Sequence, residues 1–124
     1  MRFWVLYFRE GISLAESEWD VSVELRDDYY LVVIVLNKPI TLQDAVAIWK
    51  KASEQLSELG MEHGFRKPLI ISGRAPTWLY SYLTHKWAHV FPVIANFDPK
   101  QDGAVIVASH HPDYIEMDLL KVRL

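Results

Sequence analysis

The chain has 124 residues, of which 51% are hydrophobic and 23% charged, and it contains no cysteine. This size and composition predict one compact domain spanning residues 1–124. The lack of cysteine excludes disulfides, thiol nucleophiles and Cys-ligated zinc or iron–sulfur sites. The longest apolar run, residues 29–36, is far shorter than the roughly 20 residues of a membrane helix. Since the first residues also lack a small-residue cleavage site, we expect a cytoplasmic protein without membrane contact.

The net charge of -3 is unevenly distributed along the chain. Residues 1–63 carry a net charge of -5, residues 64–100 carry +4 and residues 101–124 carry -2. In the middle segment a single acid, Asp98, faces five basic residues, which are Arg66, Lys67, Arg74, Lys86 and Lys100. Such a segment favours a small anionic ligand over a DNA duplex. Scattered, solvated charges are the alternative interpretation.

The first half of the chain predicts three strands and a helix. Alternating or continuous apolar residues predict strands over Phe3–Phe8, 21–25 and 29–36. Thr41 and Asp44 then form a capping-box-like helix start, with Asp44 in place of the usual glutamate. The helix ends at Gly60, and its apolar residues at helical spacing are Leu42, Ala45, Val46, Trp49, Ala52, Leu56 and Leu59.

The second half of the chain predicts a second helix among short strands. The predicted elements are a strand over 68–71, a helix over 76–88, strands over 91–97 and 104–108, and a final edge strand or short helix within 115–122. The buried stripe of this helix is expected to contain Leu79, Tyr82, Leu83 and Trp87. The order β-β-β-α-β-α-β-β predicts an α/β fold, a mixed sheet with helices packed on it.

The junction between the strand over 68–71 and the following helix is the first candidate site. Ser72, Gly73 and Arg74 lead to Pro76, which suits the first helical position. A helix start offers free N–H groups, Gly73 permits a close approach to the backbone, and an arginine can hold a phosphate with two hydrogen bonds. Trp78 stands in the first turn, where it can contact the same ligand. A tight turn with an exposed arginine is the alternative.

Histidines and an aspartate form the second candidate site. His85 and His89 are four residues apart and therefore share one helix face, but the pair lacks the glutamate of a zinc-protease motif. A histidine near a helix end also gains from the helix dipole without doing chemistry. Asp98 follows the next strand; an acid and an imidazole in one cleft can share a divalent cation or divide acid and base roles. Because Asp98 precedes a proline, it is equally a residue that opens a turn. Residues 109–111 (Ser-His-His) are either part of this site or exposed loop residues.

Four short motifs together carry a resemblance to a known family. They read S-G-R-A-P-T-W-L-Y over 72–80, L-T-H-K over 83–86, N-F-D-P-K over 96–100 and G-A-V-I-V-A-S-H over 103–110. This combination resembles the CRISPR-associated ring nuclease 3 family of type III CRISPR systems. Members of that family carry S-G-R-G-P-x-W-L, L-x-H, Y-D-P-R and G-x-V-V-V-x-S-H in this order.

The resemblance implies cleavage of cyclic tetra-adenylate, assisted by a divalent metal that is typically manganese. It also implies a distant relationship to Rossmann-like sensor domains for the same messenger. The family's essential histidine and aspartate correspond to His89 and Asp98, which are therefore the expected catalytic and metal-binding residues. Ala75 replaces the second glycine of the family, and Lys100 replaces its arginine. The expected substrate-binding residues are Ser72, Gly73, Arg74, Pro76, Trp78, His85 and Lys100.

The symmetry of the expected ligand bears on assembly. A ring of four equal nucleotides suits a two-fold receptor, so we expect a homodimer, and the resemblance further suggests two dimers around one ring. Two other functions are compatible with the sequence. One is a module that binds or senses the cyclic nucleotide without cleaving it, and the other is a manganese-dependent exonuclease that acts on RNA 3′ ends.

Overall fold

The computed structural model describes residues 18–60 and 66–122. Its elements are β1 (Trp19–Leu25), β2 (Tyr30–Leu36), α1 (Leu42–Gly60), β3 (Leu69–Ser72), α2 (Thr77–Trp87), β4 (Val93–Asp98), β5 (Gly103–Ser109) and β6 (Leu119–Leu120). The order confirms the predicted α/β class from β1 onward. The strand predicted over Phe3–Phe8 lies outside the described residues. The final segment, predicted as an edge strand or short helix, contains the two-residue strand β6.

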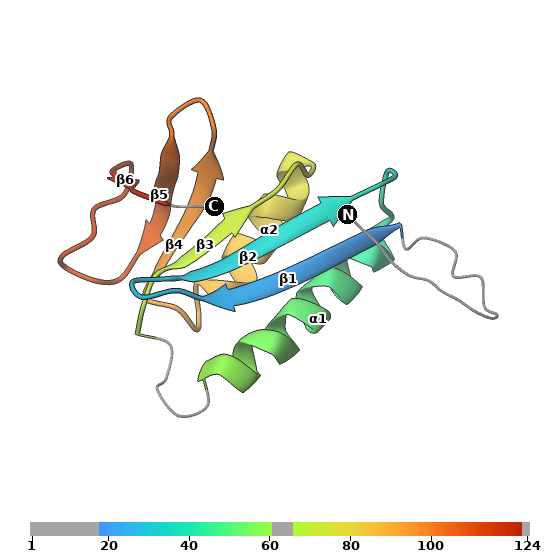
Figure 1. The fold of residues 1–124 in the computed structure, drawn as a ribbon, viewed down its shortest axis with the longest axis horizontal. Helices are drawn as coiled ribbons and strands as arrows, with labels where there is room; N and C mark the ends of the chain where they lie inside the picture. Colours follow the sequence, from blue (N-terminus) through green and yellow to red (C-terminus); the bar gives the residue numbers. More distant parts are fainter. Residues whose placement is uncertain (1–17, 61–65, 123–124) are drawn as a thin grey trace.

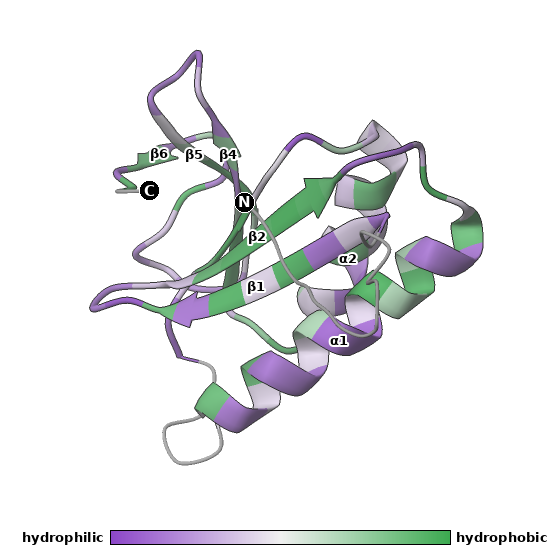
Figure 2. Ribbon diagram, turned by 45° about the vertical axis from the view of Figure 1, so that its right-hand side comes forward, coloured by the Kyte–Doolittle hydropathy of each residue, from purple (hydrophilic) through white to green (hydrophobic). Residues whose placement is uncertain are grey.

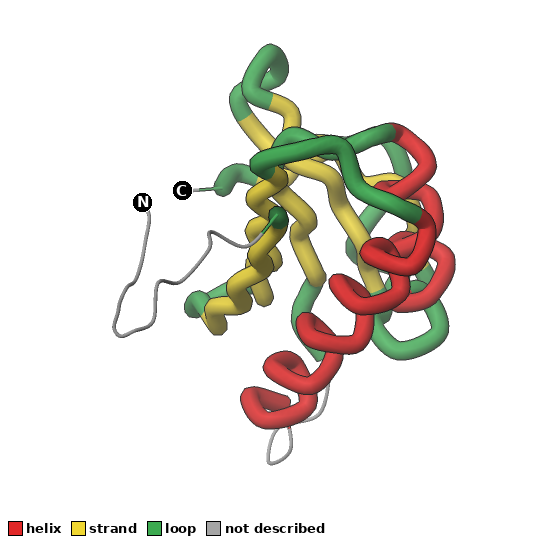
Figure 3. The backbone as a smooth tube through the Cα atoms, turned by 90° about the vertical axis from the view of Figure 1, so that its right-hand side faces the viewer, coloured by secondary structure: helices red, strands yellow, loops and turns green. Residues whose placement is uncertain are grey.

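The six described strands form one mixed sheet, in the order in which they occur along the chain (Figure 1). β2, β3 and β4 are parallel, whereas β1 is antiparallel to β2 and the β4–β5 and β5–β6 pairs are antiparallel. Both helices lie on the same face of the sheet, as Figure 3 shows. In a doubly wound Rossmann sheet helices cover both faces. Because three neighbouring strands are parallel, their carboxyl ends meet at one edge, which we call the carboxyl edge.

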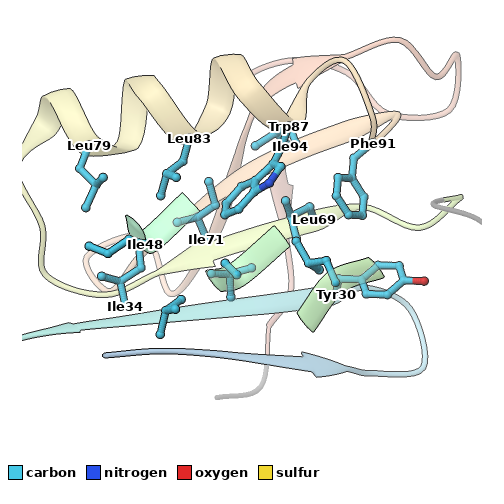
Figure 4. Close-up of a cluster of buried hydrophobic side chains, with 14 of the residues drawn as sticks. Tyr30, Ile34, Ile48, Leu69, Ile71, Leu79, Leu83, Trp87, Phe91 and Ile94 are labelled. Carbon is cyan, nitrogen blue, oxygen red and sulfur yellow. The ribbon is translucent and has the colours of Figure 1, made fainter. Parts of the chain in front are cut away.

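Two hydrophobic layers hold the sheet. Between the helices and the sheet, Leu83 and Trp87 of α2 pack with Ile71 and Ile94 of the strands (Figure 4), and the Trp87 indole N–H donates to Ser53 Oγ of α1 at 3.1 Å. On the opposite face the buried residues are Leu31, Ile70, Val93, Ala95, Ala104 and Ile106, with Tyr114, Leu120 and Val122 packed against them. β2 contributes to both layers, which explains why it is apolar almost throughout while β1 alternates (Figure 2).

The start of α1 confirms the predicted capping box, but its buried face is rotated from the predicted one. Thr41 N–H donates to Asp44 Oδ2 at 2.8 Å, and Asp44 N–H donates to Thr41 Oγ1 at 3.1 Å. Leu42 is 70% exposed and Val46 38%, whereas Ile48, which the predicted stripe omitted, is fully buried. The buried residues of the helix are Ala45, Ile48, Ala52, Leu56 and Gly60. Neither described helix combines the length and the apolar character needed to cross a bilayer.

Candidate functional site

The carboxyl ends of β3 and β4 bring two predicted groups of site residues to one edge. The two strands are parallel, and Ile71 pairs with Asn96. By this register Gly73 and Asp98, each two residues further along, stand at the same level. The loop after β3 and the turn after β4 therefore lie beside each other. In α/β sheets, ligands typically bind at such carboxyl ends.

Gly73 has a structural role in this loop. Its φ is +129°, a conformation that side chains with a Cβ rarely adopt. A Cβ at this position would also overlap the Ile34 carbonyl of β2. From the sequence, Gly73 was expected to let a ligand approach the backbone. The structure instead gives packing against β2 as the reason that no side chain fits.

The start of α2 exposes polar and aromatic groups to solvent. Arg74 is exposed and Trp78 is 41% exposed, whereas Ser72 is 6% exposed. The helix begins at Thr77, one residue later than predicted, and Pro76 is the N-cap residue without a side-chain capping hydrogen bond. The first N–H groups of α2 are thus not capped by a side chain and can donate to an anion beside Arg74.

Asp98 holds the turn that carries Lys100. Its Oδ1 accepts a hydrogen bond from the Lys100 N–H at 3.0 Å, and its carbonyl accepts one from the Gln101 N–H at 3.0 Å. The turn-opening alternative considered for Asp98 therefore describes part of its role. A carboxylate has about four acceptor sites on its two oxygens, so this one bond leaves Asp98 able to accept hydrogen bonds from a ligand.

His89 lies at the other edge of the sheet. The chain turns after α2, with the Phe91 N–H donating to the Trp87 carbonyl at 2.8 Å, and β4 then begins at Val93. Five residue steps of β4, roughly 16 Å at the rise of a strand, separate Val93 from Asp98. Within one chain the structure therefore separates His89 from Asp98.

The two helix histidines are close to each other, as their spacing predicted. The His85 and His89 rings have centroids 5.2 Å apart in an edge-to-face arrangement. Both are exposed, and His85 also lines a pocket between α2 and β4. The Ser109 side chain, in contrast, shapes its own loop through hydrogen bonds with His111 and the Tyr114 carbonyl. His110 follows β5 at the same edge as His89, because its N–H donates to the Pro92 carbonyl at 2.8 Å.

The five basic residues of the middle segment do not form one patch. Lys86 packs over the Trp49 ring, with 4.5 Å from its Nζ to the centroid, and over Tyr82. Arg66 and Lys67 precede β3 and so lie at the edge opposite to the carboxyl edge. This leaves Arg74 and Lys100 as the cations of the carboxyl edge in the described part of the middle segment.

A divalent metal needs several oxygen or nitrogen ligands that converge on one point. Among residues 18–60 and 66–122, one chain holds no group of three or more His, Asp or Glu side chains that could bind a metal. Of the expected ligands, His89 precedes the start of β4 and Asp98 ends this strand. A divalent ion can also be held by one or two side chains together with substrate phosphates and waters, so the manganese expected from the resemblance stays a prediction.

Three residues near this edge were not among the predicted site residues. Tyr80, in the second turn of α2, donates its hydroxyl to the Gly73 carbonyl at 2.6 Å, and burial raises its pKa to about 12. Thr84 and Asn96 line the pocket beside His85, and each has a buried side-chain oxygen without a hydrogen bond. The available signal was Asn96 itself, a polar residue that interrupts the apolar strand V-I-A-N-F.

Two comparisons relate the chain to known proteins. The model of a family described as CRISPR-associated protein (Cas_csx3) matches residues 50–120, from the second half of α1 to β6. An uncharacterized protein of Aquifex aeolicus (strain VF5) is 43% identical over 53 residues, which cover 43% of this chain and 47% of that protein. The aligned part thus spans less than half of that relative. All residues of the carboxyl edge described above lie within the family match.

Proposed function

The chain belongs to the CRISPR-associated Cas_csx3 family, and on this premise we propose that it cleaves cyclic tetra-adenylate. Cleavage would remove the messenger that activates the ancillary effectors of type III CRISPR defence. One observation carries the proposal: Arg74, the uncapped start of α2, Asp98 and Lys100 meet at the carboxyl edge. Cations, helix N–H groups and an acid at one edge are what phosphodiester binding and cleavage require.

Binding of the ring is the first step that these residues support. Arg74 can hold two oxygens of one phosphate, while the N–H groups at the start of α2 donate to the same anion. Lys100 contributes a point charge at the position where the family motif has an arginine, whose guanidinium can form two parallel hydrogen bonds. The exposed ring of Trp78 offers a surface on which an adenine can stack.

Cleavage needs two proton transfers. An attacking oxygen, from water or from the neighbouring ribose 2′-hydroxyl, forms a bond to phosphorus and loses a proton, while the bond from phosphorus to O5′ breaks and O5′ gains a proton. Asp98 supplies one group for this exchange and an imidazole supplies the other. Because β4 begins after His89 and ends at Asp98, we expect a site that contains both groups to take them from two copies of the chain. No step is assigned to a metal ion, and its participation stays a prediction for the experiment below.

A non-catalytic sensor module is the second candidate, and one observation favours it. A single copy has its phosphate-binding groups at the carboxyl edge, whereas His89 precedes the start of β4, the strand that ends at Asp98. Such a protein could bind the ring and release it intact. An RNA 3′ exonuclease would use the same basic loop on a linear substrate.

Product analysis separates these functions. The protein is incubated with cyclic tetra-adenylate and with linear tetra-adenylate, in the presence of manganese and in the presence of a chelator. A ring nuclease converts the cyclic substrate to linear products, and a 2′,3′-cyclic phosphate end would identify the ribose hydroxyl as the attacking group. Release of mononucleotides from the linear substrate alone indicates the exonuclease. Binding of an unchanged ring indicates the sensor.

A further inference from the structure

Tyr80, in the second turn of α2, reaches back to the loop over residues 73–76 that follows β3. Its hydroxyl donates to the Gly73 carbonyl at 2.6 Å, across seven residues of the chain. Its ring is partly buried and packs against the core between the helices and the sheet. The proposed function uses Arg74 of this loop and the start of α2, but it gives Tyr80 no role.

The backbone around this hydrogen bond is restricted on both sides. Before the bond, Gly73 has a φ of +129°, and an added Cβ would overlap the Ile34 carbonyl of β2. After the bond, Pro76 has a φ of -59° and a ψ of 149°, and Ala75 is held to extended conformations because it precedes this proline. The remaining soft torsion at Gly73 is ψ, which sets the orientation of the peptide group that joins Gly73 to Arg74.

The hydrogen bond from Tyr80 selects one orientation of this peptide group. Since glycine is conformationally permissive, a bond from outside the loop decides which way the group points. The Gly73 carbonyl points to the Tyr80 hydroxyl, and in a trans peptide the N–H points the opposite way from the carbonyl. The Arg74 N–H therefore points away from Tyr80, and it has no hydrogen-bond partner among the described residues.

We propose that Tyr80 is a positioning residue for phosphate binding by the loop over residues 73–76. By holding the Gly73 carbonyl, it fixes the direction of the Arg74 N–H, so that this N–H and the guanidinium of the same residue can donate to one phosphate. Donors that are already fixed bind more tightly than mobile ones, because less conformational freedom is lost on binding. The inference rests on the proposed function, since that proposal assigns the loop to phosphate.

The chemistry of the Tyr80 side chain suits this role. Burial raises the pKa of Tyr80 to about 12, so the hydroxyl stays a protonated donor at neutral pH. As an uncharged group it adds nothing to the Coulomb attraction of an anion. Its effect on binding can therefore be separated from that of Arg74, whose charge makes binding depend on salt.

Inorganic phosphate tests the loop without a nucleotide. It is titrated into the full chain, Tyr80→Phe and Arg74→Ala at several salt concentrations, while the NMR signal of the backbone amide at position 74 is followed. We expect phosphate to shift the Arg74 amide proton downfield in the unaltered chain. Tyr80→Phe should bind phosphate about fivefold more weakly, with a smaller shift at saturation. Salt should weaken binding by Tyr80→Phe as steeply as in the unaltered chain, and binding by Arg74→Ala less steeply.

Ser53→Ala is the matched control that separates loop position from stability. It also removes a hydroxyl that takes part in a hydrogen bond, here the one that the Trp87 indole N–H donates. We expect it to lower the melting temperature as Tyr80→Phe does, yet to bind phosphate like the unaltered chain. If the role of Tyr80 is structural alone, Tyr80→Phe will likewise keep its phosphate affinity below the melting transition, which overturns the proposal.

The results separate this inference from the proposed function. If Arg74→Ala weakens phosphate binding while Tyr80→Phe binds normally and shows the full amide shift, the positioning role is wrong and the proposed function stands. If Arg74→Ala also binds normally, the loop is not the anion site, and the phosphate contact used in the proposed function is wrong as well. If Tyr80→Phe loses affinity but the unaltered chain leaves the ring intact, the positioning role stands and the proposed cleavage is wrong.

Discussion

At the scale of single residues, Arg74 is the side chain on which phosphate binding most depends. It is exposed beside the uncapped start of α2, and its guanidinium can form two charge-assisted hydrogen bonds. We expect Arg74→Ala to weaken binding of cyclic tetra-adenylate about tenfold or more and to reduce the slope of log affinity against log salt by about one. Titrations at several salt concentrations measure both effects.

Arg66 provides the matched control for this prediction. It is also an exposed arginine of the middle segment, but it precedes β3 and so lies at the opposite edge. Arg66→Ala should leave affinity and salt slope close to those of the unaltered chain. Equal losses in the two variants would mean that general charge, and not the loop after β3, attracts the ring.

Tyr80 links the loop to stability at high pH. Its pKa is raised by burial from 10.0 to about 12. The folded protein thus holds this proton more tightly than the unfolded chain does. The contribution of Tyr80 to the free energy of unfolding is therefore complete below pH 10 and is lost as the pH rises toward 12. We expect Tyr80→Phe to lose less free energy of unfolding than the unaltered chain over this pH range.

Urea unfolding at pH values below and above this transition measures the difference. At neutral pH, Tyr80→Phe should be less stable by about 1 kcal/mol, because the hydrogen bond to the Gly73 carbonyl is lost. Tyr82→Phe, a change on the same helix, should keep the pH dependence of the unaltered chain. If the free energy of unfolding falls in parallel with pH for Tyr80→Phe and for the unaltered chain, Tyr80 does not cause the loss of stability at high pH.

At the scale of elements, α1 shows what hydrophobic spacing can and cannot predict. The capping residues Thr41 and Asp44 fixed its start correctly, because their bonds are local. The buried face was predicted with Leu42 and Val46 and without Ile48. Two neighbouring apolar stripes fit the same periodicity, and the choice between them depends on how the helix crosses the twisted sheet, which is a non-local property.

The rotated face of α1 gives a prediction for stability. Ile48 is fully buried against the sheet, so Ile48→Ala should lower the free energy of unfolding by about 2–5 kcal/mol. Leu42→Ala removes a side chain that is 70% exposed and should change it by no more than about 0.5 kcal/mol. Chemical denaturation of both variants checks the orientation. A larger loss for Leu42→Ala than for Ile48→Ala would favour the stripe predicted from the sequence.

Site residues were predictable where the sequence places them directly after a strand. The loop after β3 and the turn after β4 each follow a short apolar run, and the pairing of parallel strands brings them together. The pocket beside His85 was not predictable, because it depends on a β-bulge at Val107 and on side chains from α2, β4 and β5. The division of the basic residues between two edges likewise follows from strand direction, and it cannot be inferred from the net charge of the segment.

At the scale of the whole molecule, the separation of His89 from Asp98 relates catalysis to assembly. β4 begins after His89 and ends at Asp98, so the backbone of one chain places the two residues toward opposite ends of this strand. If both take part in cleavage, each site combines His89 of one copy with Asp98 of another. A ring with equivalent phosphates suits such a symmetric arrangement, in which each copy contributes to more than one site.

Complementation between two inactive variants tests this arrangement. His89→Ala and Asp98→Ala should each reduce single-turnover cleavage about a hundredfold or more. Mixed in equal amounts and allowed to exchange subunits, they should recover about a quarter of the normal activity, because one random pairing in four combines an intact His89 with an intact Asp98. Activity of the mixture no higher than that of either variant, although subunits exchange, would mean that cleavage does not use this pair across copies. Retained cleavage by His89→Ala together with loss in His85→Ala would assign the imidazole to His85, one helical turn nearer to Asp98.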